Sequence, residues 1–214
     1  MKRESRRILV KWLALTMLTT SSAMAHPVAF QSAWQWMLGG TPSMQNMELH
    51  YSYCNRAAVG IHAMHFEDDL DDTFFGVQHN WLLKRWNLSD AQANIYLGAA
   101  AGAARRENQS WSPAALTYVR ADYETREIFT AFDSKWIASE DVSRAVTSVS
   151  LGFAPYKAEF EQLNSWLILQ LEHISGMDDD FAVIPKLRFF KANYFFEIGY
   201  SLDGDPLVNV MIHF

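Results

Sequence analysis

Charged and amide side chains recur at alternate positions along much of this 214-residue chain. Alternate positions of a β-strand point to the same face, so side chains spaced in this way share one wall of a sheet. Rings of charged side chains set the selectivity of a pore, whereas neighbours of opposite charge can pair and fill a narrow space. We predict that these residues line a common polar space, either as the wall of a selective pore or as paired charges that fill a narrow barrel. The residues are Glu48, His50, His62, Gln78, Asn80, Asn94, Arg120, Asp122, Asp133, Lys135, Glu172, Lys186, Arg188 and Glu197.

Two histidines offer the chemistry of a copper site. Cleavage of the chain before His26 would leave a free amine and an imidazole on one residue, which together chelate Cu(II). Pro27 has no N–H, which excludes a site built on its amide nitrogen. We hypothesise that His213 supplies a third nitrogen, the alternative being a free terminus and an ordinary histidine.

The stretch HAMHFEDD raises the possibility of acid–base catalysis. His62 or His65 lies a few residues before Asp68 and Asp69, as a hydrolase acting on lipid or peptide would require. No serine or cysteine nucleophile stands at a recognisable spacing, so an enzyme is the weaker alternative, and we expect no cofactor.

Two acidic segments, EDDLDDT at 67–73 and MDDD at 177–180, could capture divalent cations through oxygen ligands. Neither has the spacing of a calcium loop. A solvated acidic surface, bridged by divalent ions to lipopolysaccharide phosphates, is the simpler interpretation. In both cases the segments attract cations.

The first 25 residues have the pattern of a secretory signal peptide. A basic start precedes an apolar centre from Ile8 to Leu18, and Ala23 and Ala25 flank Met24 in an A-x-A cleavage pattern. The mature chain, 26–214, then begins at His26. Its charge falls to 13 basic against 23 acidic residues, because the leader holds five of the 18 basic and one of the 24 acidic ones. An acidic chain of this kind argues against nucleic acid as a partner.

Period-two alternation dominates the mature chain and predicts strands rather than helices. In MELHYSY, for example, Met47, Leu49 and Tyr51 fall on one face and Glu48 and His50 on the other. The predicted strands are 28–38, 46–53, 57–66, 74–86, 91–104, 114–124, 126–138, 145–156, 163–174, 181–191, 194–202 and 207–214. Many have the length of about 9–11 residues that a tilted strand needs to cross a bilayer.

The fold class predicted is all-β, a closed antiparallel up-and-down transmembrane β-barrel of about 12 strands, with 10 as the alternative count. A soluble barrel would have to enclose the charged face as its core, which is costly. A membrane barrel turns its apolar face to lipid and keeps a polar lumen, and closure gives every backbone polar group a partner. Aromatic girdles are expected near both rims, with Trp36, Phe66, Phe74, Trp136 and Phe181 at the outer one.

Signal peptide, alternating strands and a final PLVNVMIHF together resemble a Gram-negative outer-membrane β-barrel protein. No motif assigns a characterised subfamily. In such barrels the last strand, which ends in an aromatic residue, is read by the barrel-assembly machinery. The resemblance implies this role for Val208, Val210, Ile212 and Phe214, and it implies outer-membrane lipid and lipopolysaccharide as further partners.

The sequence therefore predicts an integral outer-membrane barrel with a polar, partly salt-bridged lumen that acts as a small channel for small solutes or cations. The alternatives are the hydrolase and a copper-handling or adhesive barrel without transport.

Overall fold

The computed structural model describes residues 26–159, 161–175 and 181–214. The predicted signal peptide and the MDDD segment lie outside these residues. Every regular element described is a strand, and this part of the chain has no helix long and apolar enough to cross a membrane. The strands are β1 (Ala33–Gly40), β2 (Met44–Cys54), β3 (Ala57–Phe66), β4 (Asp72–Asn87), β5 (Ala91–Arg105), β6 (Ser112–Thr125), β7 (Ile128–Ala138), β8 (Ser143–Phe153), β9 (Asn164–Ile174), β10 (Phe181–Lys191), β11 (Tyr194–Tyr200) and β12 (Pro206–His213).

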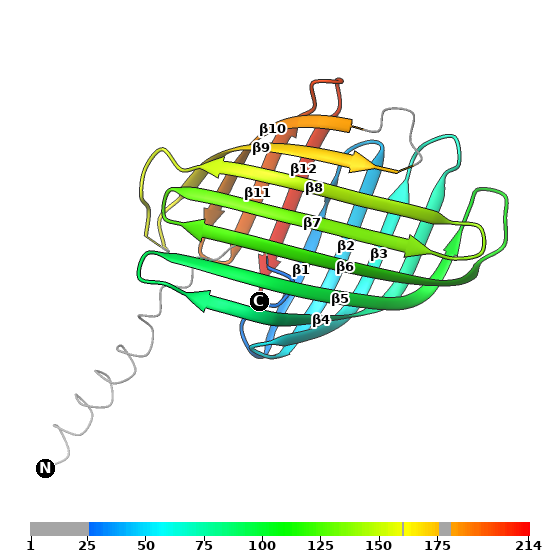
Figure 1. Ribbon diagram of the computed structural model, residues 1–214, viewed down its shortest axis with the longest axis horizontal. Coiled ribbons are helices and arrows are strands. Elements are labelled where there is room, and N and C mark those ends of the chain that lie inside the picture. Colours follow the sequence, from blue (N-terminus) through cyan, green and yellow to red (C-terminus); the bar gives the residue numbers. More distant parts are fainter. Residues whose placement is uncertain (1–25, 160, 176–180) are drawn as a thin grey trace, which may run out of the picture.

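Each strand pairs antiparallel with its neighbours in sequence, and β1 pairs with β12 to close the barrel (Figure 1). In the closing pair Trp36 lies opposite Ile212 and Leu38 opposite Val210. The up-and-down topology and the count of twelve strands confirm the predicted fold class and exclude the ten-strand alternative. Closure leaves no strand edge without a partner, which is what a bilayer demands of a β-protein.

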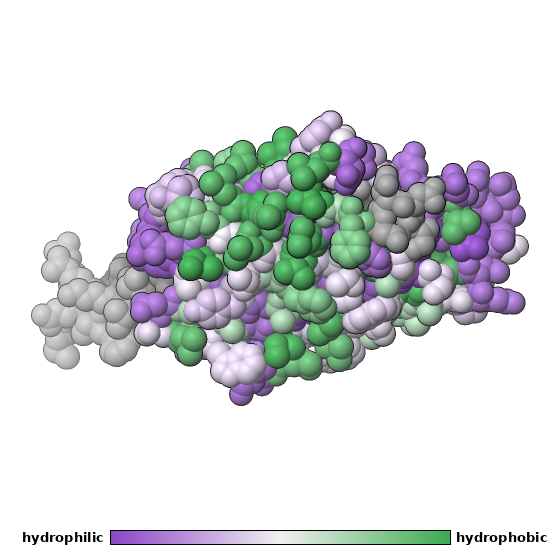
Figure 2. Space-filling model, turned by 45° about the horizontal axis from the view of Figure 1, so that its top comes forward, coloured by the Kyte–Doolittle hydropathy of each residue, from purple (hydrophilic) through white to green (hydrophobic). Residues whose placement is uncertain are grey.

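On the face shown in Figure 2, apolar residues gather over the middle of the barrel and polar residues gather toward both ends. Outward side chains of the middle of the strands, such as Val77, Val149 and Leu169, are about half exposed in the isolated chain. This is the belt expected of a barrel that faces lipid.

Part of the barrel interior is apolar as well, which the sequence analysis did not foresee. Phe66 and Phe74, predicted at the outer aromatic girdle, are fully buried inside the barrel. They have the same strand parity as the inward-facing His62 and Gln78, and they pack with Leu116 and Ile137 in a core built from β3 to β9. One side of the lumen is therefore filled by hydrophobic packing.

The first strand begins later than predicted, at Ala33 rather than residue 28. Residues 26–32, here called the N-terminal strap, precede β1; residues 26–28 are buried inside the barrel, whereas 30–32 are exposed. Val28 is 4% exposed and belongs to the inner core, while Asn80 donates a hydrogen bond to the Pro27 carbonyl at 3.1 Å. Only the start of the predicted first strand is therefore packed within the lumen, and regular pairing begins at Ala33.

Candidate functional site: a charge-paired lumen

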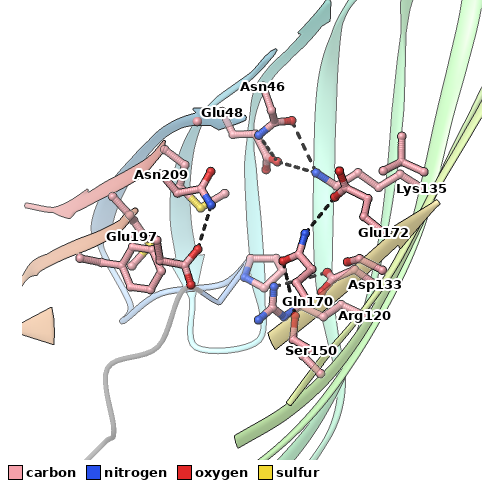
Figure 3. Close-up of a pocket in the computed structure, with 18 of the residues that line it drawn as sticks. Asn46, Glu48, Arg120, Asp133, Lys135, Ser150, Gln170, Glu172, Glu197 and Asn209 are labelled. Atoms are coloured by element: carbon pink, nitrogen blue, oxygen red, sulfur yellow. Dashed lines mark hydrogen bonds and ion pairs between the residues drawn. The ribbon is translucent and has the colours of Figure 1, made fainter. Parts of the chain in front are cut away.

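A cavity of about 220 Å³ lies inside the barrel on the side that the inner core leaves open. Side chains enter it from opposite walls: Glu48 from β2, Lys135 from β7, Glu172 from β9 and Glu197 from β11 (Figure 3). Both signs of charge meet in this space, so its electrostatics depend on how the charges pair.

One ion pair crosses the lumen. Lys135 Nζ donates to Glu48 Oε1 at 3.2 Å and to Asn46 Oδ1 at 3.5 Å, and it thus connects β7 with β2. The Glu48 residue is 4% exposed, and its carboxylate also lies 3.5 Å from ring nitrogens of His50 and His62. We call the Lys135–Glu48 pair the strut, because it joins two walls of the barrel.

A second cluster lies on the wall formed by β9 to β12. The Glu197 carboxylate accepts hydrogen bonds from Arg188 at 2.7 Å, from Asn209 at 2.8 Å and from Lys186 at 3.1 Å. Lys186 also donates to Gln170 Oε1 at 2.7 Å, and Gln170 donates in turn to Glu172. Two cations thus converge on one carboxylate.

Arg188 also stacks between two aromatic rings. Its guanidinium carbon lies 4.4 Å from the ring centre of Phe129 and 5.1 Å from that of Phe195. Phe129 packs against Trp166, and Phe195 against Phe190. All three side chains of this sandwich line the cavity near the turn that joins β10 to β11.

A third group of charges lies on β6 and β7. Arg120 contacts Asp133 at 3.3 Å and Asp122 at 3.4 Å, and Asn94 donates to Asp122 at 2.6 Å. With the strut and the Glu197 cluster, each of the four cations that line the cavity has a carboxylate partner.

A buried network of histidine and amide side chains continues behind the strut. His62 contacts Asn46 Oδ1 at 2.6 Å and also hydrogen-bonds to Gln78, and Gln78 donates to Asn80 at 2.7 Å. Asn80 reaches His50 at 3.1 Å. The network thus connects side chains of β2, β3 and β4.

Arg144 binds two aspartates at the acidic end of the barrel. Its guanidinium donates to Asp68 and to Asp72, both at 2.7 Å, and lies over the ring of Phe66. Arg106 also donates to Asp72, and this hydrogen bond is the main cause that raises the pKa of Arg106 above its usual value. Asp68 and Asp72 therefore hold the rim together over the inner core.

The structure places every polar residue predicted to share a wall on the inner face of the barrel. It also adds Arg85, which donates to Asn94 at 2.6 Å and to the hydroxyl of Tyr96. Strict alternation along β4 would place Lys84 on this face, together with Gln78 and Asn80. A β-bulge between Leu82 and Lys84 shifts the register by one residue, so Arg85 points inward instead.

The suggested hydrolytic pairs do not form as predicted. His62 contacts Gln78 and Asn46, and His65 lies 3.3 Å from Asp71 rather than beside Asp68 or Asp69. The other ring nitrogen of His65 contacts the hydroxyl of Thr73, its cross-strand neighbour. Among the described residues, this arrangement offers an ordinary surface contact and no serine or cysteine nucleophile.

His26 and His213 are both buried, each 7% exposed. His26 stacks on Tyr96 with 5.5 Å between ring centres, and its Nδ1 lies 3.5 Å from Asp122. The described residues contain no group of three or more histidine, cysteine, aspartate and glutamate side chains that could hold a metal ion. The two histidines alone therefore make an incomplete ligand set.

The residues predicted to signal assembly lie on the outward face of β12 and directly after it. Val208 and Phe214 are exposed, and Val210 and Ile212 pair with β1 across the closing seam. The outward row is therefore available for contact with lipid or with another protein.

Comparison with known proteins reveals likeness at the level of fold. No protein-family model and no curated protein matches the chain. The KdgM porin in complex with disordered oligogalacturonate is 11% identical, with a TM-score of 0.50 over 85% of this chain and 98% of that one. The KdgM porin alone is 9% identical, with a TM-score of 0.49 and the same coverage, and Pseudomonas aeruginosa OccK8 (OprE) is 8% identical, with a TM-score of 0.41 over 80% of this chain and 57% of that one. The chain thus has the fold of an outer-membrane porin-like β-barrel.

Proposed function

We propose that the protein is an outer-membrane channel for small solutes with a preference for cations. The observation that carries the proposal is a cavity with charged and apolar side chains in its wall, inside a closed barrel whose outer surface is apolar. An apolar belt is stable only against lipid, and a lumen lined with charged groups gives polar solutes a path that the bilayer denies them.

The size of the cavity limits the solutes. A volume of about 220 Å³ equals that of roughly seven waters at about 30 Å³ each. Hydrated ions and solutes of a few heavy atoms fit such a space, and long oligomers do not. The strut and the Arg188 sandwich narrow the path further.

The charge distribution favours cations. Glu67, Asp69, Glu140 and Asp141 are exposed in the connections at one end of the barrel, where they raise the local concentration of cations. Inside the cavity the cations are already paired with carboxylates.

One fold neighbour was solved with oligogalacturonate, a polyanion. The pairing of Arg120, Lys135, Lys186 and Arg188 with carboxylates opposes a ligand of that charge here. We therefore propose a smaller and oppositely charged class of solute for this chain.

Planar-bilayer recording tests the function. The mature protein, inserted under a KCl gradient, is expected to show small conductance steps and a reversal potential of the sign set by potassium. The double variant Asp69→Asn, Asp141→Asn should shift this potential toward zero, whereas Glu161→Gln, an exposed change in the β8–β9 connection at the other end, should not. Membranes that stay sealed despite verified insertion would overturn the channel, and an anion preference would overturn its selectivity.

A further inference from the structure

Glu172 differs from the other carboxylates in the wall of the cavity, because no cation pairs with it among the described residues. The others pair within the lumen, Glu48 with Lys135, Asp133 with Arg120, and Glu197 with Lys186 and Arg188. Glu172 is 7% exposed, and Gln170 donates a hydrogen bond to its Oε2 atom at 2.9 Å (Figure 3). No other hydrogen bond or ion pair reaches this carboxylate from the described part of the chain. A buried glutamate without a cationic partner is rare and calls for an explanation.

The Glu197 cluster explains how Glu172 can stay ionised. Two cations converge on Glu197, so that cluster carries an excess of positive charge. Gln170 connects it to Glu172, since the Gln170 carbonyl accepts from Lys186 at 2.7 Å while the amide nitrogen donates to the carboxylate. The excess charge therefore offsets Glu172 at a distance, and the intervening amide separates the ammonium group from the carboxylate.

Small side chains flank Glu172 on both neighbouring strands. In the register of the barrel it lies opposite Ser148 of β8 and opposite Ala182 of β10. Directly opposite residues of a sheet have Cβ atoms about 4.5–5.5 Å apart, so one ion can contact both Glu172 and Ser148. Both residues line the cavity, and no hydrogen bond to the Ser148 hydroxyl is made by the described residues. A carboxylate oxygen and a hydroxyl oxygen therefore face the same space with unused lone pairs.

The position of Glu172 suits the path of a cation through the proposed channel. Its strand, β9, ends at Ile174, which pairs with Val146 near the start of β8. The exposed residues Glu140 and Asp141 directly precede β8. Glu172 thus lies just inside the acidic end of the barrel, where the local concentration of cations is raised.

We propose that Glu172 Oε1 and the Ser148 hydroxyl form a cation subsite in the lumen, which takes a monovalent alkali cation such as K⁺. Oxygen ligands suit hard cations, and acidic side chains in a pore favour cations. One carboxylate and one hydroxyl fall far short of the about 6–8 oxygen ligands of a calcium site, and water supplies the remaining ligands of a weakly held ion. The subsite rests on the channel proposed above, because it identifies the group inside the lumen that a permeating cation contacts.

Thallium(I), which matches K⁺ in charge and nearly in size, tests binding without conduction. Crystals of the parent soaked in thallium(I) nitrate should show an anomalous scattering peak between Glu172 and Ser148. The Glu172→Gln variant keeps the shape of the side chain but removes its charge, and its crystals should lack the peak. A parent without the peak, or a Glu172→Gln variant that retains it, would overturn the subsite.

Single-channel recording measures the effect of the subsite on conduction. At about 0.01 M KCl, where the Debye length is about 30 Å, Glu172→Gln should conduct about tenfold less than the parent, the lower end of what a focused charge contributes to ion capture. At about 1 M KCl, where the Debye length is about 3 Å, the two conductances should differ much less. Glu172→Asp retains the charge and should conduct more than Glu172→Gln at low salt. Glu127→Gln, which changes an exposed carboxylate between β6 and β7, is the matched control and should conduct as the parent does.

Heat-modified mobility on gels verifies that each variant is folded before these measurements. Equal conductance of the parent and Glu172→Gln at low salt would overturn the proposal, because no uncompensated charge would then act at this point. The two measurements also separate the subsite from the channel. A thallium peak in a protein that leaves membranes sealed would remove the channel and keep the binding site, whereas a conducting parent without the peak would remove the subsite alone.

Discussion

The strut between β7 and β2 leads to a quantitative prediction for Glu48→Gln. The substitution keeps the shape of the side chain and its hydrogen-bond acceptor but removes the charge that Lys135 faces at 3.2 Å. The cation is then left inside the barrel without its carboxylate. We expect the variant to be less stable and to prefer cations less than the parent.

The expected loss of unfolding free energy follows from the distance between the two charges and from the exposure of the Lys135 side chain. Two charges at 3.2 Å attract each other by about 5 kcal/mol at an effective dielectric constant of about 20. Breaking a buried pair on one side costs about 3–5 kcal/mol. The Lys135 side chain is 23% exposed and can turn toward water, so the expected loss of unfolding free energy is smaller, about 2 kcal/mol.

A double-mutant cycle in detergent or lipid measures this value. Denaturant unfolding should give a loss of about 2 kcal/mol for Glu48→Gln and of about 3–5 kcal/mol for Lys135→Met, because the latter leaves the more deeply buried Glu48 carboxylate without its cation. The combined variant should lie within about 1 kcal/mol of the parent, because it leaves no unpaired charge. Lys157 and Glu127, a pair at 3.4 Å whose side chains are both more than half exposed, provide the control. Lys157→Met should change stability by less than about 0.5 kcal/mol.

Additive losses in the cycle would refute the strut as an interacting pair. So would single losses no larger than that of Lys157→Met. A parent-like reversal potential in Glu48→Gln would show that the pair does not face the conducting path.

Four further outcomes test other parts of the barrel. Val149→Arg, in the middle of the apolar belt, should cost about 2–4 kcal/mol in bilayer unfolding experiments, whereas Phe181→Arg at a strand end should cost about 0–1 kcal/mol. Arg188→Met should widen the path at the aromatic sandwich and increase the single-channel conductance, and an unchanged conductance would place the constriction elsewhere. Deletion of Phe214 should reduce the folded barrel recovered from outer membranes, and parent-like assembly in a pulse-chase experiment would contradict its role as a signal. Leu116→Ala, fully buried in the inner core, should cost about 2–5 kcal/mol by denaturant unfolding without changing the conductance.

Period-two alternation predicted the strands well because the pleat alone imposes it. The boundaries of β3 at 57–66 and of β10 at 181–191 agree with the structure residue for residue. Residues 192–193 join β10 to β11 in a two-residue turn, in which Ala192 adopts the positive φ of 50° that such a turn needs. Local geometry is sufficient to locate these elements.

The inner core shows where the pattern is ambiguous. Alternation separates two faces of a strand but does not state which face meets lipid when both carry aromatic residues. Phe74 and Phe75 are neighbours in β4; one is fully buried inside and the other is 48% exposed outside. Parity with Gln78 assigns Phe74 to the lumen, but its aromatic character suggested the girdle.

Pairing across the lumen could not be read from the sequence at all. Lys135 and Glu48 are 87 positions apart, and only the barrel's closure and diameter bring them together. The same holds for Arg144 and Asp72, which are 72 positions apart. Arg85 was missed for a different reason, because a bulge of one residue reverses every later side chain of the strand.

These features together divide the lumen lengthwise. The inner core and the N-terminal strap fill the side next to β4 and β5, and neither of these two strands contributes a residue to the cavity. The strut lies between that packed side and the open one, so it acts both as a brace and as part of the wall of the path. A barrel of twelve strands with short connections needs no long loop to restrict its lumen, because its own inward side chains do so. In the channel that we propose, selectivity would be set by ion pairs fixed to strands, which are held in position more rigidly than groups on a mobile loop.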